Sequence, residues 1–229
     1  MKYLIFTKKI WDKKNKDIIK HKRFIRKSLN VTEIKKIKPK RLFFIHWSKI
    51  ISKSIYSNYE CIQFHCSNLP KYRGGSPVQN QILSGKNKTK LSGFKVNGDI
   101  DGGDICVSKN LSLKGNANDI YKRIESISLK EIHKLTFKTK INYKKQIGKP
   151  SFYKRRTPSL SKIPSYLNKL EKIYNHIRML DADTYPRSFL ELKNFKIEFF
   201  NAIKKKKKIY GNFEIKKKKK NFNCCRSSR

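Results

Sequence analysis

Hydrophobic residues in the first half of the chain fall in short runs separated by basic stretches that are compatible with helices. This alternation is typical of an α/β fold, in which buried strands are joined by helices. The pattern favours a Rossmann-like open, mostly parallel sheet, followed by a small C-terminal α+β appendix. The expected strands are 3–7, 42–47, 61–66, 91–96 and 105–107, and the expected helices are 31–37, 48–59, 78–84 and 118–135.

Changes in composition divide the chain into three predicted regions. Residues 1–145 form the main domain, and residues 146–203 hold a connector, an amphipathic helix at 167–180 and an alternating strand at 195–202. Residues 204–229 form a lysine-rich tail with too little apolar content to fold alone, so we expect it to be disordered. Its abrupt ending leaves open a native tail or a truncated or frame-altered gene product.

The charge of the chain is strongly basic, with 57 Lys and Arg residues against 16 Asp and Glu residues and a formal net charge of +41. Such a charge attracts nucleic acid, anionic lipid or phosphorylated substrates. Lys, Ile and Asn are all abundant, however, as in a proteome of biased base composition. The sequence therefore also allows most of this charge to be drift on solvated faces.

The cysteines indicate a reduced, cytoplasmic protein without a metal site. None of the five forms a CxxC pair, and no histidine is spaced to complete a zinc site. The apolar start of the chain is too short for the core of a signal peptide or for a membrane span. We therefore expect neither export nor membrane insertion.

Three polar residues form the candidate catalytic group. His65 ends a predicted strand and precedes a loop rich in proline and glycine, which is a frequent place for functional groups in open α/β sheets. Gln63 lies on the same side of that strand, and Asp101 lies in a second glycine-rich loop. The histidine and the carboxylate can share proton transfer while the amide holds a carbonyl, as acyl transfer to an amine requires.

Two motifs around these residues resemble the 10-formyltetrahydrofolate-dependent formyltransferases, which include methionyl-tRNA, glycinamide ribonucleotide and nucleotide-sugar enzymes. That family carries Asn-x-His-x-Ser-Leu-Leu-Pro followed by Arg-Gly, and this chain has Gln-Phe-His-Cys-Ser-Asn-Leu-Pro over 63–70 and Arg-Gly at 73–74. The family's Leu-Asp-x-Gly loop is matched by Ile-Asp-Gly-Gly over 100–103. The interval between the two motifs is the one that the family fold requires.

The resemblance implies a role for each matched position. It makes His65 the catalytic histidine, Asp101 its acidic partner and Gln63 the carbonyl-holding amide, with 10-formyltetrahydrofolate as co-substrate and no metal. Trp47 has plain core packing as its alternative, and the basic run 154–156 could equally be a solvated face. The expected cofactor-binding residues are Trp47, Asn97, Gly98, Asp99 and Gly102, and the expected substrate-binding residues are Ser67, Arg73, Gly74, Gly75, Lys154, Arg155 and Arg156.

Two departures from the family pattern affect this interpretation. Gln63 stands where the family usually has asparagine, so the same amide is carried on one more methylene. A precisely placed oxyanion donor is sensitive to such a change. The segment before the first motif is also shorter than usual, so the pteridine pocket would have to use 46–48 and the loop 97–101.

The acceptor expected from the sequence is a small-molecule amine, with a nucleotide-linked amino sugar of surface polysaccharide synthesis favoured. This preference rests on the lysine-rich end of the chain, which we expect to be unable to form the C-terminal barrel of the transfer-RNA enzyme. Methionyl-tRNA formyltransferase activity is the alternative, with nucleic acid as partner. A non-catalytic basic protein that binds RNA or another polyanion is a third interpretation, and the oligomeric state, a dimer included, stays open.

Overall fold

The computed structural model describes residues 2–183 and 185–218, which form two compact units. The first is Met1–Arg156 and the second begins at Thr157. No helix in the described part of the chain combines the length and the apolar character needed to cross a membrane.

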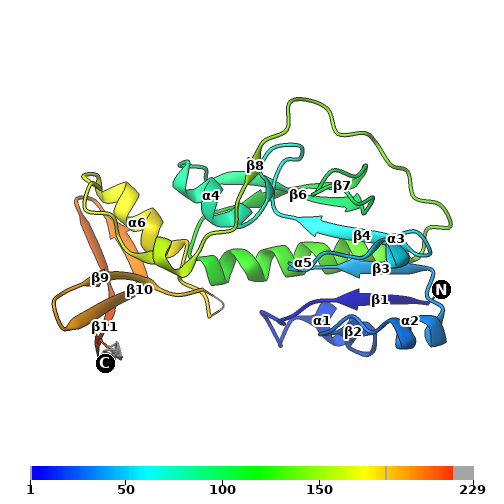
Figure 1. Ribbon diagram of the computed structural model, residues 1–229, viewed down its shortest axis with the longest axis horizontal. Helices are drawn as coiled ribbons and strands as arrows, with labels where there is room; N and C mark the ends of the chain where they lie inside the picture. Colours follow the sequence, from blue (N-terminus) through cyan, green and yellow to red (C-terminus); the bar gives the residue numbers. More distant parts are fainter. Residues whose placement is uncertain (1, 184, 219–229) are drawn as a thin grey trace, which may run out of the picture. The chain divides into compact units, whose positions relative to one another are not determined.

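The first unit is built on a six-stranded sheet with the strand order β2-β1-β3-β4-β6-β7 (Figure 1). Strands β2, β1, β3 and β4 pair in parallel, and β6 and β7 continue the sheet with antiparallel pairing. The expected mostly parallel α/β sheet is therefore confirmed. The strands are β1 (Tyr3–Phe6), β2 (Ile25–Arg26), β3 (Arg41–Phe44), β4 (Glu60–His65), β6 (Lys88–Lys95) and β7 (Ile105–Ser112).

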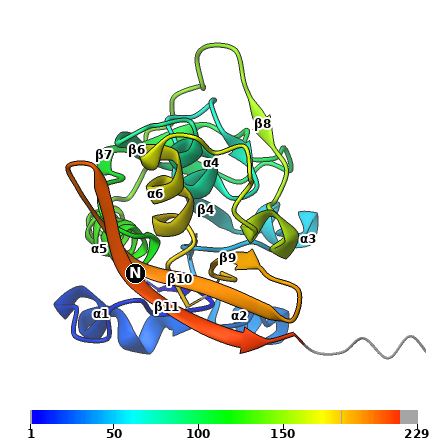
Figure 2. The ribbon, with the colours of Figure 1, turned by 90° about the vertical axis from the view of Figure 1, so that its left-hand side faces the viewer.

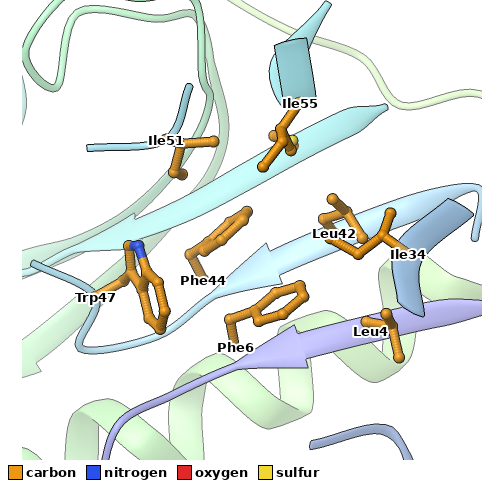
Figure 3. Packing of buried hydrophobic residues seen from close by; sticks show 9 residues of the cluster. Leu4, Phe6, Ile34, Leu42, Phe44, Trp47, Ile51 and Ile55 are labelled. Atoms are coloured by element: carbon orange, nitrogen blue, oxygen red, sulfur yellow. The ribbon is translucent and has the colours of Figure 1, made fainter. Parts of the chain in front are cut away.

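Strands β1 and β3 are buried on both faces, which explains their continuous apolar runs. Alternate residues of β1 and β3 point to one face, where they meet side chains from α2, α3 and the loop after β3 (Figure 3). Ile5 and Phe43, which come between them in sequence, are also fully buried and point to the other face. The cluster on the first face includes Leu4, Phe6, Ile34, Leu42, Phe44, Trp47, Ile51 and Ile55.

The longest helix is α5 (Ala117–Thr136), which contacts β6, β7 and α1. Asn116 caps it, and Asp119 completes a capping box by accepting from the Asn116 backbone N–H. The predicted helix 48–59 is much shorter in the structure, as α3 alone. The remaining helices of the unit are α1 (Lys16–His21), η1 (Lys22–Phe24), α2 (Val31–Ile37), α3 (Lys53–Tyr56) and α4 (Pro77–Leu83), and two short strands are β5 (Arg73–Gly74) and β8 (Phe152–Tyr153).

The second unit joins a helix to a three-stranded antiparallel sheet of order β11-β10-β9 (Figure 2). Helix α6 contacts β10 and β11. Inside the unit, Nδ1 of His176 lies 2.7 Å from the buried hydroxyl of Ser188. The elements are η2 (Pro158–Ser161), α6 (Leu170–Arg178), β9 (Ser188–Glu191), β10 (Phe195–Lys205) and β11 (Lys208–Lys217).

The lysine-rich tail differs from the expectation of disorder over 204–217. Strand β10 continues to Lys205 and pairs with β11, so that Phe199 faces Phe213 and Ile197 faces Ile215. The lysines conceal a period-two apolar pattern that suits an antiparallel pair. The remainder of the predicted tail, 219–229, lies outside the described residues.

Arg41 is a buried cation that joins the sheet to the end of α5. Its Nε lies 2.5 Å from a carboxylate oxygen of Glu60 on the neighbouring strand, and Nη1 donates to the carbonyls of Leu135 and Lys138 at 2.6 and 2.7 Å. The hydroxyl of Tyr143 donates to the other Glu60 oxygen at 2.8 Å. The ion pair is therefore surrounded by the hydrogen bonds that a buried pair needs.

Arg41→Met should lower the free energy of unfolding by about 3–5 kcal/mol, because it leaves the Glu60 carboxylate and several carbonyls without their donor. The matched control is Arg26→Met, which breaks an Arg–Glu pair of the same 2.5 Å separation with a 29% exposed side chain. That pair should contribute at most about 1 kcal/mol. Urea unfolding of the two variants measures the difference, and equal losses would contradict the assignment.

Candidate active site

His65 lies at the carboxyl end of β4 and is held between two loops. Its Nε2 is 2.7 Å from the carbonyl oxygen of Tyr72, and its Nδ1 is 3.4 Å from Oδ2 of Asp101. Since a carbonyl oxygen can only accept, Nε2 carries a proton in this arrangement. A proton on Nδ1 would have the Asp101 carboxylate as its acceptor. Both side chains are largely buried, with 7% and 9% of their surface exposed.

Asp101 is placed by a tight loop between β6 and β7. Its backbone has a left-handed φ of 48°, and its Oδ2 accepts a hydrogen bond from the N–H of Gly74 at 2.8 Å. Gly103 is required by the same turn, because a Cβ there would lie 1.6 Å from the carbonyl oxygen of Lys95. One carboxylate oxygen thus connects the loop after β4 to the loop after β6.

Gln63 lies two residues before His65 on β4, on the same face of the strand. Its side chain is half-buried, and no hydrogen-bond partner for its amide is present within residues 2–183 and 185–218. An amide without a partner on this face of β4 can bond a molecule that binds there. This is the place in which the sequence predicts a group that holds a carbonyl.

The loop after β4 is fastened by residues that come almost eighty positions later. Strand β8 pairs in parallel with β5, so that Arg73 faces Phe152 and Gly74 faces Tyr153. The Ser151 hydroxyl accepts from the N–H of Tyr72 at 2.9 Å. We call residues 141–156 the strap. No local pattern in the sequence signals this pairing, and the sequence analysis missed it.

We call residues 96–104, between β6 and β7, the acidic loop. The strap also approaches this loop through Gln146, a residue that the sequence analysis did not select. Its Nε2 donates to the carbonyls of Asp101 and Gly103, each at 2.8 Å. Its Oε1 accepts from the guanidinium of Arg73 at 2.7 and 3.3 Å. One amide therefore contacts both loops that flank His65.

The expected substrate-binding residues lie in different environments. Arg73, Gly74 and Gly75 are close to the acidic loop and the strap, and a Cβ on Gly75 would meet the Arg155 backbone at 2.4 Å. The basic run 154–156 follows β8 directly, with Lys154 and Arg155 exposed and Arg156 half-buried. The pairing of β8 with β5 thus brings this run beside the loop after His65.

Ser67 is the expected substrate-binding residue that the structure does not bring to an accessible position. It has no exposed surface, and its carbonyl accepts from the Ser92 hydroxyl at 2.7 Å. Its own hydroxyl is buried without a partner in the described residues. The loop would have to move before this hydroxyl could touch an acceptor.

The expected cofactor-binding residues divide between a buried and an exposed group. Trp47 is 8% exposed and packs against the rings of Phe6 and Phe44, with centroids 6.0 and 5.7 Å away, as core packing requires. Its indole Nε1 is nonetheless buried without a partner in the described part of the chain. The loop residues 97–99 are exposed, and Gly102 is half-buried. Asn97 accepts from the N–H of Asp99 at 3.2 Å, and Gly98 has a φ of 97°.

His46 precedes Trp47 and is enclosed by aromatic rings. It lies 5.8 Å from the Trp11 ring and 5.3 Å from the Tyr121 ring, and burial lowers its pKa to about 4. Nearby, Glu125 accepts from the N–H groups of Trp11 and Asp12 at 2.8 and 3.1 Å, and burial raises its pKa. The loop after β1 is thereby held against α5.

Family models match two parts of the chain. Residues 7–134, more than half of it, match the formyl transferase model, and residues 158–216 match the model described as methionyl-tRNA formyltransferase, C-terminal domain. The chain belongs to the formyl transferase family. The expected family resemblance is therefore confirmed.

Individual relatives agree with this assignment. A solved methionyl-tRNA formyltransferase from Clostridium thermocellum is 37% identical, with a TM-score of 0.87 over 95% of this chain and 100% of that one. A sugar N-formyltransferase from a Shewanella species has a TM-score of 0.61 at 15% identity, over 84% of this chain and 93% of that one, and so shares the fold alone.

Curated relatives match a smaller part of this chain. The methionyl-tRNA formyltransferase of Endomicrobium trichonymphae is 31% identical over 59% of this chain. The match takes in 46% of that protein, so the chain spans about half the length of this curated relative.

The stability of the fold should decrease in acid because of His46. The unfolded chain binds a proton on this group near pH 6.5, and the folded protein binds it only near pH 4. Folding is therefore favoured above pH 6.5, and on the order of 3 kcal/mol is lost as pH falls through this window. Urea unfolding between pH 7 and 4 measures the slope.

His46→Asn is the variant for this test, because asparagine tolerates the left-handed φ of 51° and does not titrate. It should be less stable than the wild type at pH 7 but lose less stability on acidification. Parallel pH slopes in the two proteins would contradict the role of His46.

Proposed function

We propose that the protein transfers the formyl group of 10-formyltetrahydrofolate to a primary amine, and that the amine is the methionyl group of a charged transfer RNA. The geometry of His65 and Asp101 supports the chemistry, within a chain that belongs to the formyl transferase family. The match of 158–216 to the C-terminal domain of methionyl-tRNA formyltransferase supports the acceptor.

In the proposed reaction, the amine nitrogen attacks the formyl carbon, and the carbon–N10 bond of the folate breaks. His65 takes the amine's proton at Nδ1, because Nε2 already carries one, and Asp101 then accepts a hydrogen bond from Nδ1 and stabilises the charge that the imidazole gains. The leaving N10 receives a proton in exchange, so no net proton is consumed. The half-buried Gln63 amide donates an N–H to the oxygen of the tetrahedral intermediate.

The residues near this group are chemically suited to a folate and its formyl carbonyl. Gln63 has an amide without a partner in the described chain, beside a histidine and a carboxylate. In the proposed complex the loop 97–102 and the segment around Trp47 line the pteridine pocket. The extra methylene of Gln63 extends its amide farther from β4 than asparagine would.

The proposed acceptor differs from the amino sugar that the sequence favours. That preference assumed that the end of the chain cannot fold, whereas 195–217 form a paired antiparallel hairpin. The 37% identical solved relative is a methionyl-tRNA formyltransferase, and the sugar N-formyltransferase is only a fold-level neighbour. The exposed cations at 154 and 155 are suited to phosphates of the acceptor.

Removal of either proposed catalytic side chain should abolish most activity. We expect His65→Asn and Asp101→Asn to lower kcat roughly a hundred- to ten-thousand-fold while the proteins remain folded. His133→Asn on α5 is the control and should leave kcat unchanged. Release of tetrahydrofolate in steady-state assays measures the rates, and near-wild-type turnover of the His65 variant would refute its role.

The acceptor is tested by offering purified protein 10-formyltetrahydrofolate with charged initiator methionyl-tRNA or with a nucleotide-linked amino sugar. We expect formyl transfer to the methionyl-tRNA, weakening as salt concentration rises because phosphate contacts release counterions. Transfer to the amino sugar alone would contradict the proposed acceptor and support the one that the sequence favours. Folate-independent RNA binding without transfer to either acceptor would support the non-catalytic interpretation.

A further inference from the structure

We infer that Gln146 is a positioning residue of the active site, which holds the acidic loop so that Asp101 reaches His65. This inference rests on the proposed function for its kinetic readout, but the contacts that carry it are structural. Gln146 lies outside both motifs of the family resemblance and belongs to the strap.

The direction of the strands creates the need for such a residue. Strand β6 runs antiparallel to β4, so its last residue, Lys95, lies opposite Ile62, three residues before His65. Three residues of strand span about 10 Å. The loop that follows β6 must therefore fold back along β4 before Asp101 can approach the histidine.

The folded-back loop has little regular structure of its own to hold it. It contains three glycines, and Asp101 itself has a left-handed φ. Glycine-rich segments have many accessible conformations, and a left-handed aspartate is sparsely populated, so contacts from outside must select this conformation. Two carbonyls of this loop, those of Asp101 and Gly103, are the ones to which Gln146 donates.

The chemistry of the contact fits an amide and excludes its isosteres. The carbonyls of the acidic loop require a donor, and the guanidinium of Arg73 requires an acceptor, and a glutamine side chain offers both. Glutamate has the same shape but would place a carboxylate oxygen against two carbonyl oxygens. Methionine has a similar length and makes neither kind of bond. Asparagine would be one methylene too short.

The backbone on both sides of Gln146 is fixed independently of its side chain. Lys144 exchanges two backbone hydrogen bonds with Ile105 at 2.8 and 2.9 Å, and the Tyr143 hydroxyl donates to Glu60. Farther along, the N–H of Arg73 donates to the Ser151 carbonyl at 2.8 Å. A change at Gln146 should therefore release the acidic loop without releasing the strap.

The kinetic test compares Gln146→Glu and Gln146→Met with the wild type. Both should lower kcat about ten- to a hundredfold, since a displacement of about 1 Å can have such an effect, and leave KM for the folate within about twofold. Ile147→Ala is the matched control, because the neighbouring side chain is 89% exposed, and its kcat should be unchanged. Wild-type kcat in Gln146→Glu, or an equal loss in Ile147→Ala, would overturn the inference.

A double-mutant cycle tests whether Gln146 acts through Asp101. If it does, Gln146→Glu should cost little further activity in an Asp101→Asn background, because the positioned group is already lost. Additive losses in kcat would show that Gln146 acts by another route and would overturn the inference.

A spectroscopic measurement separates this inference from the proposed function. The imidazole ¹⁵N resonances of His65, assigned with His65→Asn, should shift in Gln146→Glu and stay in place in Ile147→Ala, whether or not the wild type transfers formyl groups. An inactive wild type with this shift would refute the proposed function alone. Unchanged His65 resonances in Gln146→Glu would refute the positioning role.

Discussion

Because β6 runs antiparallel to β4, the carboxylate and the imidazole of the site cannot meet as neighbours at the ends of adjacent parallel strands. The acidic loop has to return along the sheet, and a single carboxylate oxygen of Asp101 then contacts the N–H of Gly74 and faces His65. Three features bring Asp101 to His65 in this way: the tight turn at Gly103, the left-handed backbone at Asp101 and the amide of Gln146. The rest of the first unit fixes the strands from which the loop departs.

The sequence predicts the parts of this arrangement that depend on local patterns. The burial of β1 and β3 on both faces shows as apolar runs, and the placement of His65 follows from a strand that ends in a loop rich in proline and glycine. Gln63 and His65 share a face because side chains alternate along a strand. The family resemblance, in which the interval between the two motifs also matches, then implies that Asp101 belongs to the same site.

The parts that the sequence does not predict depend on contacts between distant segments. Nothing around Ser151 or Gln146 marks them as neighbours of the loop after β4, because the pairing of β5 with β8 involves only two residues of each strand. Trp47 could be core or pocket from its sequence context, and it packs as core. In the C-terminal hairpin, lysines dominate the composition and hide the alternation of Phe213 and Ile215.

The strap also affects where the first unit ends along the chain. Helix α5 ends at Thr136, and a boundary drawn at 145, where the composition changes, would keep every residue of the two sequence motifs. A polypeptide cut there would nonetheless lack Gln146, Ser151 and β8, and with them the contacts that fasten the loops after β4 and β6. The compact first unit accordingly extends through Arg156, past the last element of the central sheet and its covering helix.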